Sequence, residues 1–256
     1  MLTKTPEIEI RECLSLDELD ACVALQRQVF GLPDIELSPR RHLIVSRRAG
    51  GWTLGAFAGK KLAGFLHYMV AANPREKPYG YSHMAAVLPE FQNKGVGAAL
   101  KWAQRIRSLS EGREFITWTW KPMQARNAHF NLNRLGATVT SYGRNFYGTG
   151  YDQQEADGSG AGTLESDRLF AEWDLNSTRV AGLANGEHSL IEEKPALKIS
   201  IPRDWEALLK ASESDAAREQ TRVREEFEGA FRSGLVCRSF DRETSSYLLY
   251  LTQQVK

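Results

Sequence analysis

Residues 92–97, Gln-Asn-Lys-Gly-Val-Gly, have the residue types and the position of a phosphate-binding turn. Residues 81–88 before them form an apolar, strand-like run, and apolar residues recur every three or four positions from Gly95 onward. The first N–H groups of a helix have no partner within the helix, and the helix dipole is positive there. Gly95 and Gly97 also allow a ligand to approach the backbone closely. The pattern therefore fits two interpretations, an ordinary strand–loop–helix junction or a phosphate or pyrophosphate site.

Two common nucleotide-binding motifs do not fit this stretch. A P-loop needs Lys followed by Ser or Thr after its last glycine, whereas Lys94 precedes the glycine here. A dinucleotide-binding turn needs a third small residue and an acidic residue about 20 positions later. Leu100 occupies the place of the third glycine, and residues 115–120 contain no acid. Both motifs are excluded on chemistry.

The helix after the turn is predicted to bury one apolar face. The expected buried residues are Val96, Ala99, Leu100, Ala103 and Ile106, and the expected opposite face carries Lys101, Gln104, Arg105 and Ser108.

The motif at residues 92–97 resembles the Q/R-x-x-G-x-G/A signature of the GNAT acyltransferase superfamily, and residues 87–92 resemble the V-x-P-E-[YF]-[QR] run that precedes it in many members. Three more patterns resemble a branch of predicted acetyltransferases. They are W-T-W-x-P at 118–122, N-A-x-F-N at 127–131 and S-D-R at 166–168. The resemblance covers about residues 7–175.

The resemblance implies an α/β fold, a mixed sheet with helices on both faces, for a catalytic domain at residues 1–175. Periodicity predicts the element order β-α-α-β-β-β-α-β-α-β-β over this range, with a polar, glycine-rich loop at 151–163. Residues 176–256 form a small C-terminal β-α-β-β addition with two helices in its α part. Its order echoes residues 8–70, so a degenerate partial copy of the fold is one interpretation.

An acyl-CoA, acetyl-CoA or another thioester, is the co-substrate that the resemblance implies. The backbone of Ala85, Ala86 and Val87 is expected to hold the pantetheine arm. The pyrophosphate is assigned to Gln92, Asn93, Lys94, Gly95, Val96, Gly97 and Ala98. Asn127 and Asn131 are four residues apart, are expected to share a helix face, and are further candidates for binding the arm or the acceptor.

His83 is the candidate general base, because the strand holds no acidic residue and an ordinary imidazole pKa near 6.5 suits deprotonation of an ammonium. Simple alternation places His83 on one face with Tyr81, Ala85 and Val87. A histidine packed in the sheet is the structural alternative.

The general acid is not evident, since Leu132 stands where the family often has Tyr; Tyr142, Tyr147 and Asn131 remain alternatives. Trp118 and Trp120 are interpreted either as pocket-lining or as core residues. Arg126 and Arg168 are candidates for an acceptor carboxylate or for surface ion pairs.

Composition gives no general attraction to nucleic acid or membrane, because the net charge is +1. Cys13, Cys22 and Cys237 are far from C-x-x-C spacing and are expected to be buried thiols in a reducing compartment. No metal site is expected. No apolar run approaches 18 residues, and a cytoplasmic location is expected.

The leading functional hypothesis is an N-acyltransferase that moves an acetyl group, or a larger acyl group such as succinyl, to a small amine such as an amino acid. The alternative is a non-catalytic acyl-CoA-binding or scaffolding protein. A third interpretation makes residues 176–256 an assembly module, for example for a homodimer.

Overall fold

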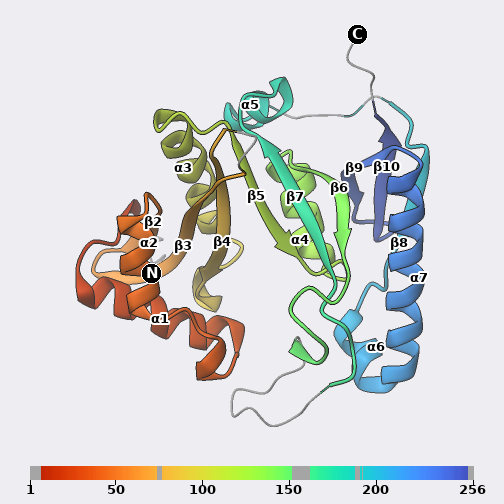
Figure 1. Ribbon diagram of the computed structural model, residues 1–256, viewed down its shortest axis with the longest axis horizontal. Coiled ribbons are helices and arrows are strands. Elements are labelled where there is room, and N and C mark those ends of the chain that lie inside the picture. Colours follow the sequence, from red (N-terminus) through yellow and green to blue (C-terminus); the bar gives the residue numbers. More distant parts are fainter. Residues whose placement is uncertain (1–6, 74–76, 152–161, 188–190, 192, 253–256) are drawn as a thin grey trace, which may run out of the picture. The chain divides into compact units, whose positions relative to one another are not determined.

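The computed structural model describes residues 7–73, 77–151, 162–187, 191 and 193–252 (Figure 1). Most of the predicted loop at 151–163 lies outside these residues. The predicted α/β class with a mixed sheet and helices is confirmed, and so is the predicted element order up to residue 175. The chain divides into two compact units, one up to Ile116 and one from Thr117.

Four strands form the sheet of the first unit, and they are antiparallel in the order β1-β2-β3-β4. They are β1 (Ile8–Glu12), β2 (Trp52–Ala58), β3 (Lys61–Ala71) and β4 (Tyr79–Val87).

Two helices, α1 (Leu16–Phe30) and α2 (Arg40–Arg48), lie between β1 and β2 in the sequence. The S-x-x-E pattern at Ser15–Glu18 forms a capping box at the start of α1, where Ser15 Oγ accepts from Glu18 N and the Glu18 carboxylate accepts from Ser15 N. Gly31 ends α1 with a positive φ of 64°. These signals are local, which explains why the sequence located α1 well.

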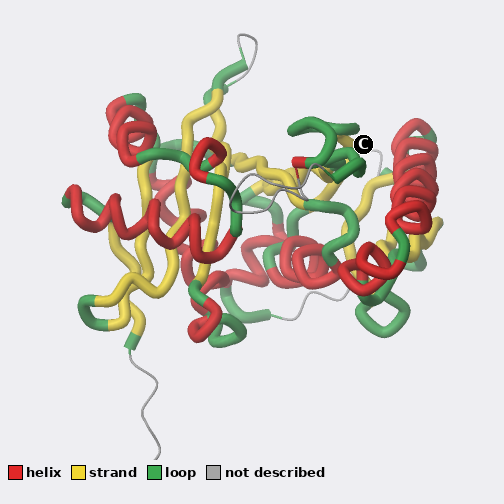
Figure 2. The backbone as a smooth tube through the Cα atoms, turned by 90° about the horizontal axis from the view of Figure 1, so that it is seen from below, coloured by secondary structure: helices red, strands yellow, loops and turns green. Residues whose placement is uncertain are grey.

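The two faces of this sheet carry different helices. Leu19 and Leu25 of α1 and Leu43 of α2 pack with Phe65 of β3 and Ala86 of β4 in one apolar cluster. The third helix, α3 (Val96–Ser110), packs on the other face. Helices flank the strands of this unit in the tube view (Figure 2).

A β-bulge in β4 falls at His83. In the pairing with β3, His67 lies opposite Met84 and Tyr68 lies opposite Ser82, so His83 is the extra residue. The bulge changes the alternation of faces: His83 contacts the α2 side, whereas Val87 lies beside Gly97 of α3. The predicted common face for His83, Ala85 and Val87 is therefore wrong, because simple alternation does not hold across a bulge.

The buried face of α3 also differs from the prediction. Ile106 is 67% exposed, whereas Lys101 is 4% exposed and Gln104 and Ser108 are fully buried. Lys101 Nζ donates to Ser82 Oγ of β4 at 2.9 Å, and Ser108 Oγ donates to Tyr68 Oη of β3 at 2.9 Å. The sheet thus supplies polar partners for a polar helix face, which periodicity of apolar residues cannot reveal.

The second unit begins within β5 (Phe115–Trp120), and its strands follow the order β5-β7-β6-β9-β10-β8. The other strands are β6 (Thr138–Gly143), β7 (Arg168–Asp174), β8 (Leu197–Ser200), β9 (Leu235–Asp241) and β10 (Ser246–Leu251). The helices are α4 (Ala125–His129), α5 (Thr178–Ala184), α6 (Trp205–Ala211) and α7 (Glu213–Arg232). The long α7 lies beside β8–β10 in both views (Figures 1 and 2).

Three elements of this unit differ from what the sequence pattern indicates. Residues 123–135 have a helical pattern but are not one α-helix, because α4 passes at Phe130 into a π-helical turn, Phe130–Arg134. Residues 139–147 have a strand pattern, but β6 ends at Gly143. The helix α5 was not predicted from the sequence, since its seven residues give only about two turns of pattern.

The C-terminal segment shares its sheet with residues 117–151, since β6 pairs with β9 through Val139 and Cys237. Its first strand, β8, pairs with β10, whereas β1 pairs with β2 in the N-terminal part. The similar element order is thus accompanied by a different strand pairing. The sequence analysis places the end of the catalytic domain at residue 175, and this boundary stays a prediction.

Candidate active site

The turn at residues 92–97 lies between β4 and α3, as predicted. The chain leaves β4 through a 3-10 turn at Pro89–Phe91 and enters α3 at Val96. The side chain of Gln92 donates from Nε2 to Val87 O at 2.9 Å and so ties the turn to the end of β4.

The backbone of this turn has the geometry of an anion-binding site. Asn93 and Gly95 both have positive φ, 59° and 83°. The first helical hydrogen bond runs from Ala99 N to Gly95 O at 2.9 Å, so the N–H groups of residues 96–98 precede the helical ladder. A Cβ on Gly95 would meet no atom within 4 Å, and one on Gly97 would meet only Val87 Cγ2, at 3.9 Å. A ligand can therefore approach these N–H groups.

Positive charge lies beside the turn. Lys94 Nζ and Lys61 Nζ are 5.8 and 5.6 Å from the centre of the Phe91 ring. Glu90 is exposed and accepts from Lys61 Nζ at 2.7 Å. Lys94 thus places a cation within the turn, two residues before α3 begins.

His83 is held by the loop between α1 and α2. Its Nε2 lies 3.2 Å from Ser38 Oγ, and the hydroxyl can donate to or accept from this nitrogen. Ser38 itself is fixed by the buried Gln26 of α1, which accepts from Ser38 N at 2.9 Å and donates to Ser38 O at 3.1 Å. The ring of the candidate base is therefore oriented from outside its own strand.

Two further histidines surround His83, and we call His42, His67 and His83 the histidine cluster. The three ring centres are 5.4, 5.7 and 6.0 Å apart. His67 Nδ1 is 2.9 Å from Thr53 Oγ1. The Nε2 atoms of His42 and His67 are buried and have no hydrogen-bond partner among the residues that the structure describes.

Burial favours the neutral imidazole of His83 and of His67. Burial lowers the pKa of His83 to about 4, and a charge on His42 contributes to the lowering. Burial also lowers the pKa of His67 to about 3, with smaller contributions from His83 and His42. At pH 7 the ring of His83 is therefore unprotonated and able to accept a proton. Within the described residues, no group of three histidine, cysteine or acidic side chains has the arrangement of a metal site.

The sequence identified His83 but not its two neighbours. His42 comes from α2 and His67 from β3, 41 and 16 positions before His83, and no spacing rule connects the three. The sequence signal was only that three of the five histidines fall between residues 42 and 83.

The candidate general acids differ in burial and in hydrogen bonding. Leu132 is fully buried in the core, so its position offers no proton donor. Tyr142 donates to Asp167 Oδ2 at 2.8 Å, and burial raises its pKa. Asn131 is 5% exposed, and Tyr147 is 41% exposed. None of these observations assigns the acid.

Asn127 and Asn131 do not share a face. Asn127 is exposed and donates to Gln124 Oε1 at 2.6 Å, whereas Asn131 is buried. The π-helical bond from Leu135 N to Phe130 O, at 3.1 Å, adds a residue to the turn and ends the regular four-residue spacing. Both residues lie in the second unit, whereas residues 83–98 lie in the first.

The tryptophans of the W-T-W-x-P pattern are core residues. Trp118 packs edge-to-face on Trp173 with ring centres 5.7 Å apart. Trp120 Nε1 donates to Tyr247 Oη at 3.2 Å, and both tryptophans are buried. Their burial and these contacts support the core interpretation.

The S-D-R pattern also has a structural role. Asp167 is buried, and its carboxylate accepts from Arg224 Nε at 2.8 Å and from Asn145 N at 3.0 Å. Arg168 is also buried, donates to the backbone oxygen of Asp167 at 2.8 Å and lies over the Tyr147 ring. The pattern therefore fixes the start of β7 against α7.

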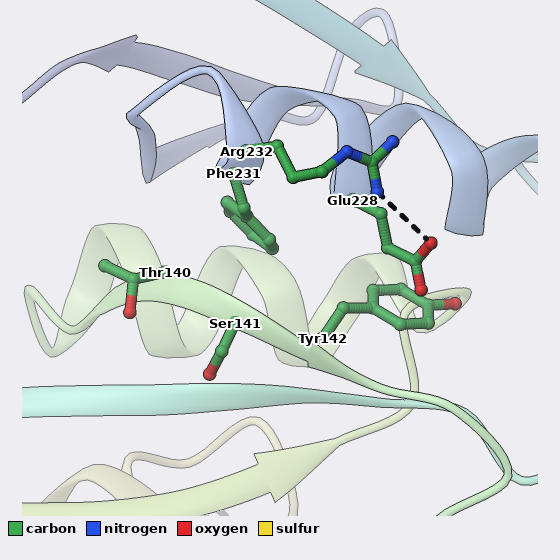
Figure 3. A pocket seen from close by; sticks show the side chains of 6 residues that line it. All are labelled: Thr140, Ser141, Tyr142, Glu228, Phe231 and Arg232. Carbon is green, nitrogen blue, oxygen red and sulfur yellow. Dashed lines mark ion pairs between the residues drawn. The ribbon is translucent and has the colours of Figure 1, made fainter.

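A pocket of about 280 Å³ lies between β6 and α7 (Figure 3). Its lining residues are Thr140, Ser141, Tyr142, Glu228, Phe231 and Arg232. Arg232 pairs with Glu228, one turn earlier on the same helix, at 3.8 Å (Figure 3). Glu228 is also paired with Arg144. Its charged groups thus already have partners, and no predicted site residue lines it except Tyr142.

Solved structures of acetyltransferases share this fold. The ribosomal-protein-S18-alanine N-acetyltransferase of Escherichia coli aligns at 16% identity and a TM-score of 0.52, over 67% of this chain and 96% of that one. An N-acetyltransferase from Staphylococcus aureus Mu50 aligns at 12% identity and 0.51, over 66% and 99%. A GNAT-family acetyltransferase from Streptococcus pneumoniae aligns at 16% identity and 0.50, over 65% and 98%.

The chain therefore has the GNAT acetyltransferase fold, and about a third of it extends beyond these structures. Residues 19–130, which include the turn and the histidine cluster, match the family described as Acetyltransferase (GNAT) family. No curated protein sequence matches the chain.

Proposed function

We propose that this protein is an acyl-CoA-dependent N-acyltransferase of the GNAT family that acylates a small amine. The observation that carries the proposal is the turn at 92–97, where positive φ at Asn93 and Gly95 and open space at Gly97 leave helix-start N–H groups accessible. The matching family at residues 19–130 supports the same assignment. An acetyl group is the preferred acyl group, and succinyl is retained as an alternative.

In the proposed reaction the acceptor ammonium gives a proton to His83. The free amine then attacks the thioester carbonyl, the C–S bond breaks, and coenzyme A leaves as a thiolate that takes up the second amine proton. Backbone N–H groups of residues 85–87 are proposed to bind the pantetheine arm and polarise the carbonyl. His83 is neutral at pH 7 and can accept a proton, but its pKa of about 4 makes it a weaker base than the ordinary imidazole that the sequence argument assumed. Asn127 and Asn131 remain proposed ligands.

An amino acid or a related metabolite is the proposed acceptor. The expected cytoplasmic location and homodimer also remain proposals. Across the described residues, no helix is long and apolar enough to span a membrane.

A second candidate function is acyl-CoA binding without transfer, favoured by the buried Leu132 at the family's usual acid position. This alternative predicts coenzyme A binding with no turnover for any amine.

Calorimetric titration with acetyl-CoA, succinyl-CoA and free CoA tests the proposal. Gly97→Glu places a carboxylate where the pyrophosphate is proposed to bind and should abolish binding, because charge and bulk oppose the ligand. Gly97→Ala is the matched control, since its Cβ has room and should leave the fold unchanged. Gly95 is less suitable, because its φ of 83° makes any side chain strained. No binding by the wild type would overturn the proposal.

A further inference from the structure

The histidine cluster contains two imidazoles that the proposed reaction does not use. His42 and His67 come from different elements, and their Nε2 atoms are buried without a hydrogen-bond partner among the described residues. Buried polar atoms without partners are uncommon and costly in folded proteins. Both histidines contact the bulged residue His83, so they are placed to act on it.

We propose that His42 and His67 are positioning residues that set the proton affinity of His83 and limit the histidine cluster to one proton. The proposal rests on the function proposed above, because it takes His83 as the base. His42 and His67 contact the proposed base, His83, and are not proposed to contact the acceptor.

Geometry supports the limit of one proton. Ring centres 5.4–6.0 Å apart place two imidazolium charges at a separation where they repel strongly in a buried environment. The titratable groups that face His83 are His67 on β3, His42 on α2 and Tyr81 on β4, whose ring centre is 6.5 Å away. The groups from α1 and the α1–α2 loop, Gln26 and Ser38, are neutral.

The consequence for catalysis is a base that stays free of protons before the acceptor binds. An imidazolium cannot take the proton of an ammonium, so a protonated His83 is inactive. Burial is the main cause of the low pKa of His83, and positive charge on His42 lowers this pKa further. Removing His42 should therefore raise the pKa of His83.

His42→Gln is the test variant, because His42 is half-buried on a helix and its replacement is less disruptive than that of the fully buried His67. NMR titration of the ring protons should show the His83 midpoint moving up from about 4 toward 6.5 in the variant. The signal of His129 in the same spectra is the internal control, since its charged neighbours are Arg242 and Arg134. In kinetics, the acid limb of the kcat/KM profile should move to higher pH by the same amount.

An unchanged His83 midpoint would overturn the inference, as would simultaneous protonation of two cluster rings above pH 5. A lower kcat with an unmoved acid limb would assign His42 only a structural role and would also overturn it. If no amine is acylated by the wild type, the proposed function fails, whereas the NMR titration still decides whether the cluster holds one proton.

Discussion

Single residues of the histidine cluster connect the chemistry of the site to the stability of the fold. His67 is fully buried and its pKa is about 3 in the folded chain, against about 6.5 in an unfolded chain. Between these values the unfolded chain binds a proton that the folded chain does not. Stability therefore falls as the pH drops below 6.5.

We expect His67 alone to reduce the free energy of unfolding by about 2 kcal/mol between pH 7.5 and pH 5. Urea unfolding at the two pH values measures this loss in the wild type. His67→Gln should lose about 2 kcal/mol less over the same range, because glutamine does not titrate. Equal losses in both proteins would contradict the neutral, buried state of His67.

At the scale of elements, α3 is unusual because it buries a lysine against β4. Burial lowers the pKa of Lys101 well below its ordinary value, and Lys101 Nζ donates to Ser82 Oγ and Gln104 Oε1. An unfolded chain keeps this proton up to about pH 10.4. Burial of Lys101 therefore makes the folded state more stable as the pH rises from 7 toward 10.

Replacing Lys101 by Met should remove the rise in folding stability with pH that the buried lysine causes. This rise amounts to at most about 1.4 kcal/mol per pH unit. Urea unfolding at pH 7 and pH 9 should show a smaller rise in stability for Lys101→Met than for the wild type. Lys60→Met, at an exposed turn position, is the matched control and should keep the wild-type slope. A wild-type slope in Lys101→Met would show that Lys101 is charged in the folded protein.

The link between β7 and α7 is the second feature at this scale. The Asp167 side chain has no exposure, and it accepts from Arg224, Tyr142 and the backbone of Asn145. Asp167→Ala leaves Arg224 largely buried without this partner and should reduce the free energy of unfolding by about 3–5 kcal/mol.

Asp215→Ala provides the control, because the Asp215–Arg218 pair on α7 is mostly exposed. Its expected effect is below about 1 kcal/mol. Thermal or denaturant unfolding of both variants measures the difference. Similar losses would mean that the S-D-R pattern does not act through its buried carboxylate.

At the scale of the whole molecule, the C-terminal addition, residues 176–256, contributes buried side chains to the core of the second unit. Tyr247 of β10 donates to Pro122 O at 2.7 Å, and Arg179 of α5 donates to Leu132 O at 2.8 Å. The side chains that this segment buries completely or nearly so include Val180, Ile199, Ala216, Val223, Phe227, Cys237, Phe240, Tyr247, Leu249 and Tyr250.

A chain cut after Leu175 should therefore be insoluble or unfolded, because residues 117–175 lose the partners of their buried groups. Solubility and circular dichroism check this. Co-expression of residues 176–256 should restore a soluble complex. A folded, coenzyme-binding fragment would instead support the interpretation of the addition as a separable assembly module.

The sequence by itself determined most of the elements and the glycine turn at residues 92–97, because their signals are local. Capping at Ser15, the glycines at 95 and 97 and the alternation of residues 115–120 each depend on neighbours a few positions away. Tertiary structure decided the rest. The bulge at His83 arises from pairing with β3, and the buried face of α3 from polar partners on the sheet. The histidine cluster unites three elements, and contacts between distant segments follow from packing rather than from spacing in the chain.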